Sequence, residues 1–260
     1  MRLVTWNVNS LRVRLPRLLE LLAEHQPDVV CLQETKSAAD AFPAAELAGA
    51  GYTAVHASGG RWAGVALLAR VGLELADPVY GLPGDPVPDE ARWCEATVSG
   101  IRVVSVYAPN GRALDSPEFP RKLAFLDAAI DRVTALRETA LIMSGDMNIA
   151  PADVDVYDPP AFTGSTHVSA QERDRLGQIL ERGGLVDAYR TLHPTEVQYT
   201  WWDYRAGNFH KGLGLRIDLA LVSQGLVDRL RRCGIDRDYR KGTKPSDHAP
   251  LLVDLANPPH

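Results

Sequence analysis

The sequence predicts an α/β fold in which two β-sheets pack face to face with helices on the outside. Short apolar runs of strand character alternate with longer segments of helical periodicity. In addition, residues 3–9 resemble residues 141–148, because each is an apolar run that ends in carboxamide or carboxylate side chains. Two such halves suggest two packed sheets. We expect one domain over residues 1–260, since this length can bury a substantial core.

Nine segments have the composition of β-strands. They are rich in Val, Leu, Ile, Thr and Trp, and Gly, Pro or Asn residues bound them. The expected strands are Leu3–Asn7, Asp28–Gln33, Gly64–Ala69, Cys94–Val98, Arg102–Tyr107, Ala140–Ser144, Gln198–Trp201, Ile217–Val222 and Leu251–Leu255.

Three longer segments place apolar residues at helical spacing. The leucines of Leu15–His25 fall at positions i, i+3, i+4 and i+7, and Pro16 is tolerated because it lies in the first turn. Pro117–Glu138 also has its apolar residues on one face, and Ala170–Arg182 is followed by a glycine pair that ends a helix. We therefore expect three helices.

The composition is that of a globular protein without a membrane anchor. Hydrophobic residues make up 45% of the chain and charged residues 23%, and no run approaches the roughly 18 apolar residues that span a bilayer. The first two residues lead directly into Leu3–Trp6, which leaves no room for a secretory signal. Cys31, Cys94 and Cys233 fit neither a CxxC metal site nor a disulfide framework. We expect a cytoplasmic protein that does not bind membranes.

The charge distribution does not decide whether the partner is a nucleic acid. The net charge of −5 argues mildly against one, because nucleic-acid-binding domains are usually basic. Seven basic and two acidic residues nevertheless lie between Arg229 and Lys244. A basic face on an acidic body and ordinary solvated charge both explain this pattern.

Several expected strands end in polar side chains that packing does not require. Strand ends are where a rigid scaffold displays functional groups. The polar residues at these positions are Asn7, Glu34, Tyr107, Asp146 and Asn148, and Asp247 and His248 come just before the last expected strand.

This set of side chains suits a hard divalent cation. Its carboxylate and carboxamide oxygens favour Mg²⁺, with Mn²⁺ as the alternative ion, whereas a zinc site would require more His and Cys. Phosphodiester hydrolysis requires an activated water, stabilised phosphoryl oxygens and assistance to the leaving group, and the set can supply all three. Each residue alone also has an ordinary structural explanation, so the inference depends on their joint occurrence. The remaining histidines, among them His25 and His167, show no such grouping and are interpreted as structural or surface residues.

Seven motifs together resemble the exonuclease III family of DNA-repair nucleases, within the endonuclease/exonuclease/phosphatase superfamily. The resemblance spans essentially the whole chain. The Gly-Asp-x-Asn and Ser-Asp-His motifs are common to the superfamily, whereas Gln-Glu-Thr-Lys and Trp-Trp-Asp-Tyr-Arg favour the DNA-repair branch. The motifs are Trp6–Arg12, Leu32–Lys36, Tyr107–Asn110, Gly145–Ile149, Trp201–Arg205, Leu215–Asp218 and Lys244–Pro250.

The resemblance implies a fold and an activity. The fold is a four-layer α/β sandwich of two packed mixed β-sheets flanked by helices, with the site at one edge of the sheets. The activity is metal-dependent hydrolysis of DNA 5′ to abasic sites, together with 3′→5′ exonuclease action on duplex DNA. The expected partner is therefore duplex DNA with abasic sites or 3′ ends.

The resemblance also implies roles for the polar residues. The residue matching Glu34 binds the metal with help from those matching Asn7 and Asp247. Asp146 matches the residue thought to activate the water. The sequence does not decide between Asp146 and His248 as the base.

The other matching residues act on the phosphate. His248 matches a histidine that is held by the residue matching Asp218 and contacts the scissile phosphate. Asn148 and Tyr107 match residues that stabilise the developing charge. A second ion held by Asp146, Asn148 and His248 is the alternative to a single metal.

Four residues next to these motifs are candidates for DNA contact. Arg112, Arg205 and Arg216 adjoin motif residues, where phosphate contacts would position a duplex, although a solvated charge explains each of them equally well. Trp201 could pack on a sugar or on a flipped abasic nucleotide. Asn9 stands where some relatives carry Asp, which would remove a charge near the metal.

Two other classes of function remain. One is a superfamily phosphodiesterase that acts on a phospholipid or inositol phosphate, but the sequence shows no amphipathic or apolar anchoring segment. The other is a non-catalytic DNA-binding module, but Glu34, Asp146 and His248 are all present. We expect a monomer, because the expected helices and strands account for the apolar stripes of the sequence and leave none to form an interface between copies.

Overall fold

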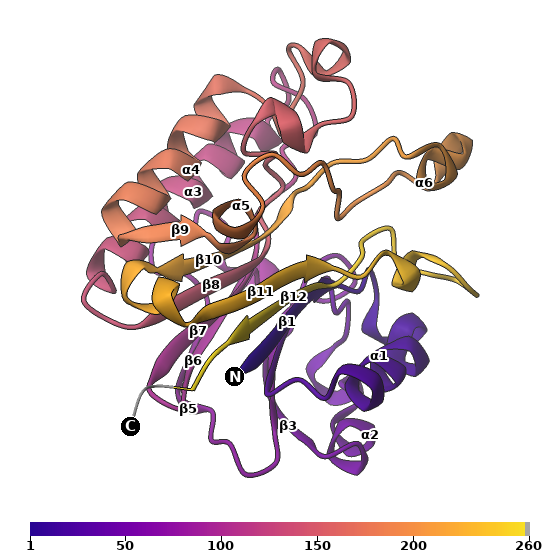
Figure 1. The fold of residues 1–260 in the computed structure, drawn as a ribbon, viewed down its shortest axis with the longest axis vertical. Coiled ribbons are helices and arrows are strands. Elements are labelled where there is room, and N and C mark those ends of the chain that lie inside the picture. Colours follow the sequence, from indigo (N-terminus) through magenta and orange to yellow (C-terminus); the bar gives the residue numbers. More distant parts are fainter. Residues whose placement is uncertain (258–260) are drawn as a thin grey trace.

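The computed structural model describes residues 1–257, in which two six-stranded sheets pack face to face between helices (Figure 1). The strand order is β11-β12-β1-β2-β4-β3 in one sheet and β5-β6-β7-β8-β10-β9 in the other. Each sheet contains one parallel pair, β1 with β2 and β7 with β8, and its other neighbouring strands are antiparallel. The predicted pair of mixed sheets is therefore confirmed.

The strands of the first sheet are β1 (Arg2–Asn7), β2 (Val29–Gln33), β3 (Tyr52–Ala57), β4 (Val65–Arg70), β11 (Leu230–Ile235) and β12 (Leu251–Leu255). Those of the second are β5 (Ala76–Tyr80), β6 (Trp93–Val98), β7 (Ile101–Tyr107), β8 (Leu141–Asp146), β9 (Leu185–Asp187) and β10 (Asp218–Ser223). The α-helices are α1 (Leu11–His25), α2 (Ala44–Gly49), α3 (Glu118–Ala135), α4 (Ala170–Gly183), α5 (Ala188–Leu192) and α6 (Asn208–Lys211).

The four strands that the sequence pattern missed are the four edge strands of the two sheets. These are β3 and β11 in one sheet, and β5 and β9 in the other. Edge strands lie partly in solvent, so they lack the continuous apolar run that marks a buried strand. Strand β5 contains the Asp-Pro pair at 77–78, which is compatible with an edge position because proline cannot donate to a sheet.

One predicted strand is wrong. Gln198–Trp201 forms no strand, and Trp201 makes only isolated bridges with Leu215 and His248. Tyr199 and Trp201 are half-buried in a loop whose backbone bonds to Leu215 and Ala249 without forming a ladder, so their aromatic, strand-like composition does not reflect sheet pairing.

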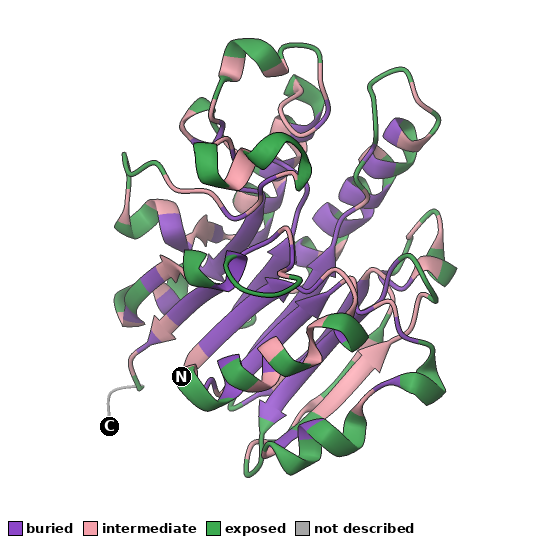
Figure 2. Ribbon diagram, turned by 90° about the vertical axis from the view of Figure 1, so that its right-hand side faces the viewer, coloured by how far each residue is buried: buried purple, intermediate pink, exposed green. Residues whose placement is uncertain are grey.

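Three apolar cores separate four layers, as predicted. The central core combines residues of both sheets, such as Val29 and Val103. A second core lies between the first sheet and α1 and α2, and a third lies between the second sheet and α3 and α4. In Figure 2 the strands are buried through the centre of the molecule and the exposed residues lie on the outer helices and loops. No helix within residues 1–257 is long and apolar enough to cross a membrane.

Candidate active site

The sheet topology brings the polar strand ends to one edge of the molecule. Parallel pairing of β1 with β2 sets Asn7 beside Gln33, immediately before Glu34, and parallel pairing of β7 with β8 sets Tyr107 beside Asp146. Antiparallel β10 starts at this same edge, with Asp218 opposite Asp146. Carboxyl ends of parallel strands and amino ends of their antiparallel neighbours necessarily meet at one edge.

A close approach between β7 and β8 accounts for the glycine that precedes Asp146. A Cβ atom on Gly145 would collide with the carbonyl oxygen of Val106, so only glycine lets the two strands come this close. This packing sets the Asp146 carboxylate, which is almost fully buried, beside Tyr107 at the end of β7.

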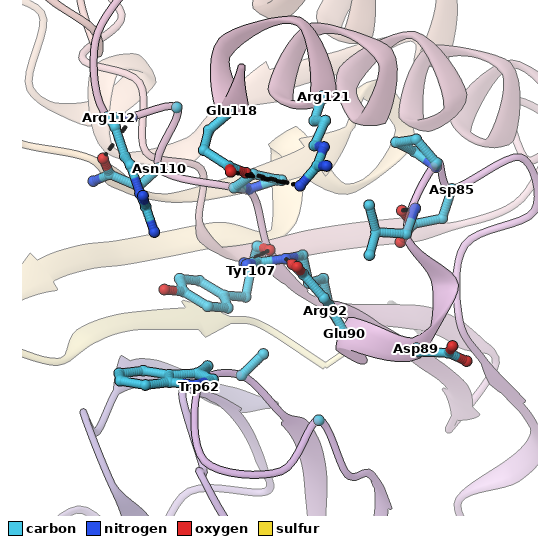
Figure 3. A pocket seen from close by; sticks show the side chains of 16 residues that line it. Trp62, Asp85, Asp89, Glu90, Arg92, Tyr107, Asn110, Arg112, Glu118 and Arg121 are labelled. Carbon is cyan, nitrogen blue, oxygen red and sulfur yellow. Dashed lines mark hydrogen bonds and ion pairs between the residues drawn. The ribbon is translucent and has the colours of Figure 1, made fainter. Parts of the chain in front are cut away.

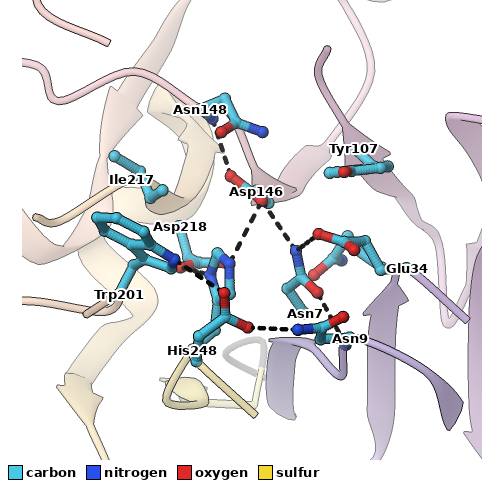
Figure 4. A network of polar contacts seen from close by, with 12 residues as sticks. Asn7, Asn9, Glu34, Tyr107, Asp146, Asn148, Trp201, Ile217, Asp218 and His248 are labelled. Atoms are coloured by element: carbon cyan, nitrogen blue, oxygen red, sulfur yellow. Dashed lines mark hydrogen bonds and ion pairs between the residues drawn. The ribbon is translucent and has the colours of Figure 1, made fainter. Parts of the chain in front are cut away.

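Asp218, His248 and Asp146 form a contact series (Figure 4). The Nδ1 atom of His248 lies 2.8 Å from Oδ2 of Asp218, and its Nε2 atom lies 3.8 Å from Oδ2 of Asp146. A carboxylate can only accept a hydrogen bond, so Asp218 keeps the proton on Nδ1 and directs Nε2 toward Asp146. Asp218 therefore orients the imidazole, as the sequence resemblance implies.

The surrounding charges shift the pKa values of both members of this pair. Burial on its own lowers the pKa of His248, but attraction to Asp218 and then Asp146 outweighs burial and raises it to about 10. Burial raises the pKa of Asp146 to about 7, and the charge on His248 opposes this rise. A pair of ionisable groups with strongly shifted pKa values at one rim marks a candidate catalytic site.

Glu34, Asp146 and His248 are arranged in a way that suits a metal ion. One ligand atom from each lies within 4.8 Å of those of the other two. The Nδ2 atom of Asn7 donates to Oε1 of Glu34 at 2.7 Å and to Oδ2 of Asp146 at 2.9 Å, so the amide links the two carboxylates. The two carboxylates of this group offer the oxygen ligands that a hard divalent cation such as Mg²⁺ prefers, and His248 adds a nitrogen beside them.

Asp247 lies at the same rim but outside that trio. The Nε1 atom of Trp201 donates to its Oδ2 at 3.0 Å, and Nδ2 of Asn9 donates to its Oδ1 at 2.9 Å. Burial on its own would raise the pKa of Asp247, but His248 and these two donors keep it below its usual value. Asp247 is therefore an ionised carboxylate, and its role as a metal ligand stays a prediction.

Tyr107 borders a pocket of about 440 Å³ at the edge of the site (Figure 3). Its hydroxyl keeps its proton, because burial and then the charge of Glu34 raise its pKa well above the usual value. The guanidinium of Arg92 lies 4.6 Å from the centre of the Tyr107 ring and supports it from one side. Trp62, whose surface is 74% exposed, lines the same pocket together with Arg112.

Asn148 completes the set at the end of β8. Its backbone N–H donates to Oδ1 of Asp146 at 2.9 Å, and its Nδ2 donates to the carbonyl of Ala108 at 2.9 Å. Its side-chain oxygen accepts from Nδ2 of Asn110 at 3.3 Å. Asn148 has a left-handed backbone conformation, with φ of 52°, which asparagine adopts more readily than most other residues.

Comparison with known proteins identifies the family. The model of the endonuclease/exonuclease/phosphatase family matches residues 4–248, which is most of the chain. The chain belongs to this family. The family resemblance and the four-layer fold predicted from the sequence are therefore confirmed.

Individual members of this family are similar over nearly their full lengths. Exodeoxyribonuclease III of Haemophilus influenzae is 34% identical, over 98% of this chain and 100% of its own. The solved 3′ phosphatase NExo from Neisseria, bound to product DNA hairpin, is 42% identical with a TM-score of 0.95, over 98% of this chain and 99% of its own. An AP endonuclease from Archaeoglobus fulgidus is 35% identical with a TM-score of 0.94, over the same shares of the two chains.

The structure separates the arginines that were predicted to contact DNA. Arg112 is exposed at the pocket beside Tyr107, and the side chain of Arg205 is 88% exposed and pairs with Asp203. The prediction for Arg216 is wrong, because this residue is fully buried between Asp155 and Asp187. Its place within the motif Leu215–Asp218 reflects buried ion pairing with Asp155 and Asp187 rather than contact with a ligand.

Sequence reasoning misses several residues around this site because they lie far from the motifs or resemble ordinary polar residues. Lys36 reaches Glu34 at 2.8 Å and Oδ1 of Asn9 at 2.6 Å. His167, expected to be a structural or surface residue, has its Nδ1 atom 2.6 Å from the carbonyl oxygen of Asn148. Lys122, to which no motif gives a role, lies beneath the same carbonyl. Of these residues, only Lys36 could have been found from the sequence, since it belongs to the Gln-Glu-Thr-Lys motif.

Proposed function

We propose that this protein is a Mg²⁺-dependent DNA-repair nuclease, which cleaves DNA 5′ to abasic sites and removes nucleotides from 3′ ends of duplex DNA. The observation that carries the proposal is the continuous series of polar contacts from Asp218 through His248, Asp146 and Asn7 to Glu34. The relatives support the substrate, since they include an exodeoxyribonuclease III, a 3′ phosphatase bound to a DNA hairpin and an AP endonuclease.

Glu34 and Asn7 would hold the cation, with Asp146 beside them and Asp247 at the same rim. The fit is supported by the three-residue group of ligand atoms within 4.8 Å, to which Glu34 contributes. A divalent ion supplies positive charge to the scissile phosphate when it is bound there. Mn²⁺ satisfies the same oxygen ligands and is the alternative ion.

The protein side chains divide the remaining chemistry. Asp146, fixed through both oxygens by Asn7 and Asn148, would accept a proton from the attacking water. His248 is held by Asp218 and, with its raised pKa, would donate from Nε2 to the phosphate oxygens. These are preorganised contacts, which stabilise charge without rearrangement during the reaction.

Two further groups would stabilise the phosphate. Tyr107 retains its phenolic proton, so it would donate a hydrogen bond to a non-bridging oxygen. The carboxamide of Asn148, which donates one N–H to Ala108, would donate its other N–H to the phosphate from the end of the neighbouring strand β8. Arg112 and Arg205 would contact the backbone of the duplex, and Trp201 would pack against the sugar at the scissile position.

The direct test uses two DNA duplexes, one with a single abasic site and one with a recessed 3′ end. We expect Mg²⁺-dependent nicking of the first and shortening of the second, and we expect EDTA to abolish both. The Asp146→Asn protein is the matched control for a contaminating nuclease. Retention of the abasic duplex in a complex without cleavage, in the presence of Mg²⁺, would support the DNA-binding module and contradict the proposal.

A phosphodiesterase of this family with a phospholipid or inositol phosphate substrate remains the second enzyme class. It would leave both duplexes intact and hydrolyse a phosphate ester bond of the small substrate instead. We also propose a cytoplasmic monomer. The three cysteines are buried and free, in keeping with a reducing compartment. Size-exclusion chromatography with light scattering tests the monomeric state.

A further inference from the structure

A buried lysine lies directly behind the phosphate-facing residues. Lys122 comes from the first turns of α3 and has no exposed surface. Its ammonium group lies 2.5 Å from Oε1 of Glu172, 2.7 Å from the carbonyl oxygen of Asn148 and 3.2 Å from that of Asn110. A lysine is almost never buried without partners, and here its three donors find acceptors on three different segments.

We propose that Lys122 and Glu172 are positioning residues, which act through the backbones of Asn110 and Asn148. They hold the carboxamide of Asn148, and that of Asn110, which donates to it, beside the catalytic residues. The inference deepens the proposed nuclease function and rests on it. Neither residue faces the substrate side of the site. They act through the two loops that follow β7 and β8.

Glu172 fixes the third segment, which leads into α4. Its Oε1 atom accepts from the backbone N–H of His167 at 2.9 Å and from the Oγ1 atom of Thr166 at 2.8 Å. Its Oε2 atom accepts from the backbone and the hydroxyl of Ser169, which completes a capping box at the start of α4. The carboxylate therefore anchors the 166–169 segment to the helix and to the lysine at once.

His167 also contacts the carbonyl oxygen of Asn148. Its Nδ1 atom lies 2.6 Å from the carbonyl oxygen of Asn148, which Lys122 also contacts. A carbonyl only accepts, so Nδ1 carries the proton and the ring stays neutral with Nε2 free to accept from Nδ2 of Asn110 at 3.5 Å. Burial and then the charge of Lys122 lower the pKa of His167 to about 4, in agreement with a neutral ring.

The local backbone is built to admit the lysine. Gly111 has a φ of 83°, and a Cβ atom there would lie 2.9 Å from Cδ of Lys122 and 3.0 Å from Oγ1 of Thr166. Any larger residue in this turn would push the lysine stem away from the two carbonyls. The glycine after Asn110 therefore serves the buried ion pair as well as the turn.

Two variants separate positioning from folding. Lys122→Met keeps the length of the side chain but leaves the Glu172 carboxylate buried without its partner, so we expect it to be destabilised. The double variant Lys122→Met/Glu172→Gln removes both charges and keeps a glutamine that can complete the capping box, so we expect near-wild-type folding. In the double variant, the loops that follow β7 and β8 lose the Lys122–Glu172 pair that links them.

The assay is cleavage of the recessed 3′ duplex under saturating Mg²⁺. For the double variant we expect kcat to fall by about 10- to 100-fold, since a displacement of about 1 Å at a reacting group costs up to about 100-fold. KM should change by less than about threefold, because the substrate-contacting side chains are unchanged. Val133→Ala, a cavity variant three turns along α3, is the matched control and should lose stability with kcat unchanged.

Amide hydrogen exchange supplies a readout that does not depend on activity. We expect faster exchange in residues 108–112 and 147–150 of the double variant, with the sheets unchanged. Thr166→Val, measured in parallel, keeps the ion pair but removes the hydroxyl proton that the carbonyl of Asn110 and Oε1 of Glu172 share. It should therefore loosen residues 108–112 and 166–169 and leave residues 147–150 unchanged.

A double variant with kcat within about twofold of wild type, or with unchanged exchange in both loops, overturns the inference. If the wild-type protein cleaves neither duplex, the proposed nuclease function fails, and the exchange comparison still decides whether Lys122 and Glu172 hold the loops.

Discussion

Replacing Arg216 by methionine separates a buried structural role from a role in DNA contact. The guanidinium of Arg216 lies 2.6 Å from Oδ1 of Asp155 and 2.7 Å from Oδ2 of Asp187, with no exposed surface. Methionine fills similar space without a charge. The two carboxylates then lose a buried partner, and such a loss costs about 3–5 kcal/mol.

The remaining contacts place the expected loss at the lower end of that range. Asp155 keeps Arg190 at 2.5 Å, and Asp187 keeps two backbone donors at the start of α5. We therefore expect a decrease of about 3 kcal/mol in the free energy of unfolding. In a chain of about this size, 1 kcal/mol shifts Tm by about 2–4 °C, so Tm should fall by about 6–12 °C.

Differential scanning calorimetry measures this shift, and DNA binding at several salt concentrations tests the alternative. Each phosphate contact adds about 0.9 to the slope of log affinity against log salt. Arg112→Met is the matched control: Arg112 is exposed, so we expect an unchanged Tm and a slope reduced by about one. A Tm within about 2 °C of wild type for Arg216→Met, with a slope reduced by about one, would refute the buried-network interpretation.

Four further perturbations test the chemistry of the site. Asp146→Asn should lower kcat for nicking by about 10³-fold or more, and near-wild-type turnover would contradict its role. Its Tm should be equal or higher, because a neutral asparagine avoids the cost of burying a charge, which raises the pKa of Asp146 to about 7. Asp218→Asn should lower the pKa of His248 from about 10 and move the basic limb of the kcat profile to lower pH, and an unmoved limb would show that Asp218 does not set it. The sign follows from a protonated His248, whose contribution is lost as pH rises through its pKa. EDTA should abolish cleavage reversibly, and Glu34→Gln should raise the Mg²⁺ concentration for half-maximal rate; an unchanged Mg²⁺ requirement would exclude Glu34 as a ligand.

The central strands can be predicted because a strand that is buried on both faces is a continuous apolar run in the sequence. Strands β2 and β12 are fully or almost fully buried, and the predicted bounds agree with the observed ones to within one residue. The edge strands β3, β5, β9 and β11 escape prediction, since their residues are shared between solvent and sheet. The segment at Gln198–Trp201 misleads for a different reason, because a half-buried loop that makes only isolated bridges can have the aromatic and β-branched composition of a strand.

The candidate catalytic residues can be predicted because polar side chains at strand ends have no packing reason to be there. Motifs and strand ends together assign Asn7, Glu34, Asp146, Asp218 and His248 to one site, and direct contacts link them in the folded protein. The order of these contacts does not follow from spacing, since Asn7 and Asp146, which share a hydrogen bond, are 139 positions apart in the chain.

The sequence by itself determined the family, the layered architecture and the identity of the polar residues at the strand ends, because alternation, motif order and residue type are local properties. Only the tertiary structure decided which arginine reaches solvent and which is buried, and which neighbours shift the pKa values of Asp146 and His248. It alone revealed that Lys122 lies beneath Asn148, on a helix that carries no motif. Burial and electrostatic coupling depend on distances through space, and those distances exist only after the two sheets have packed together.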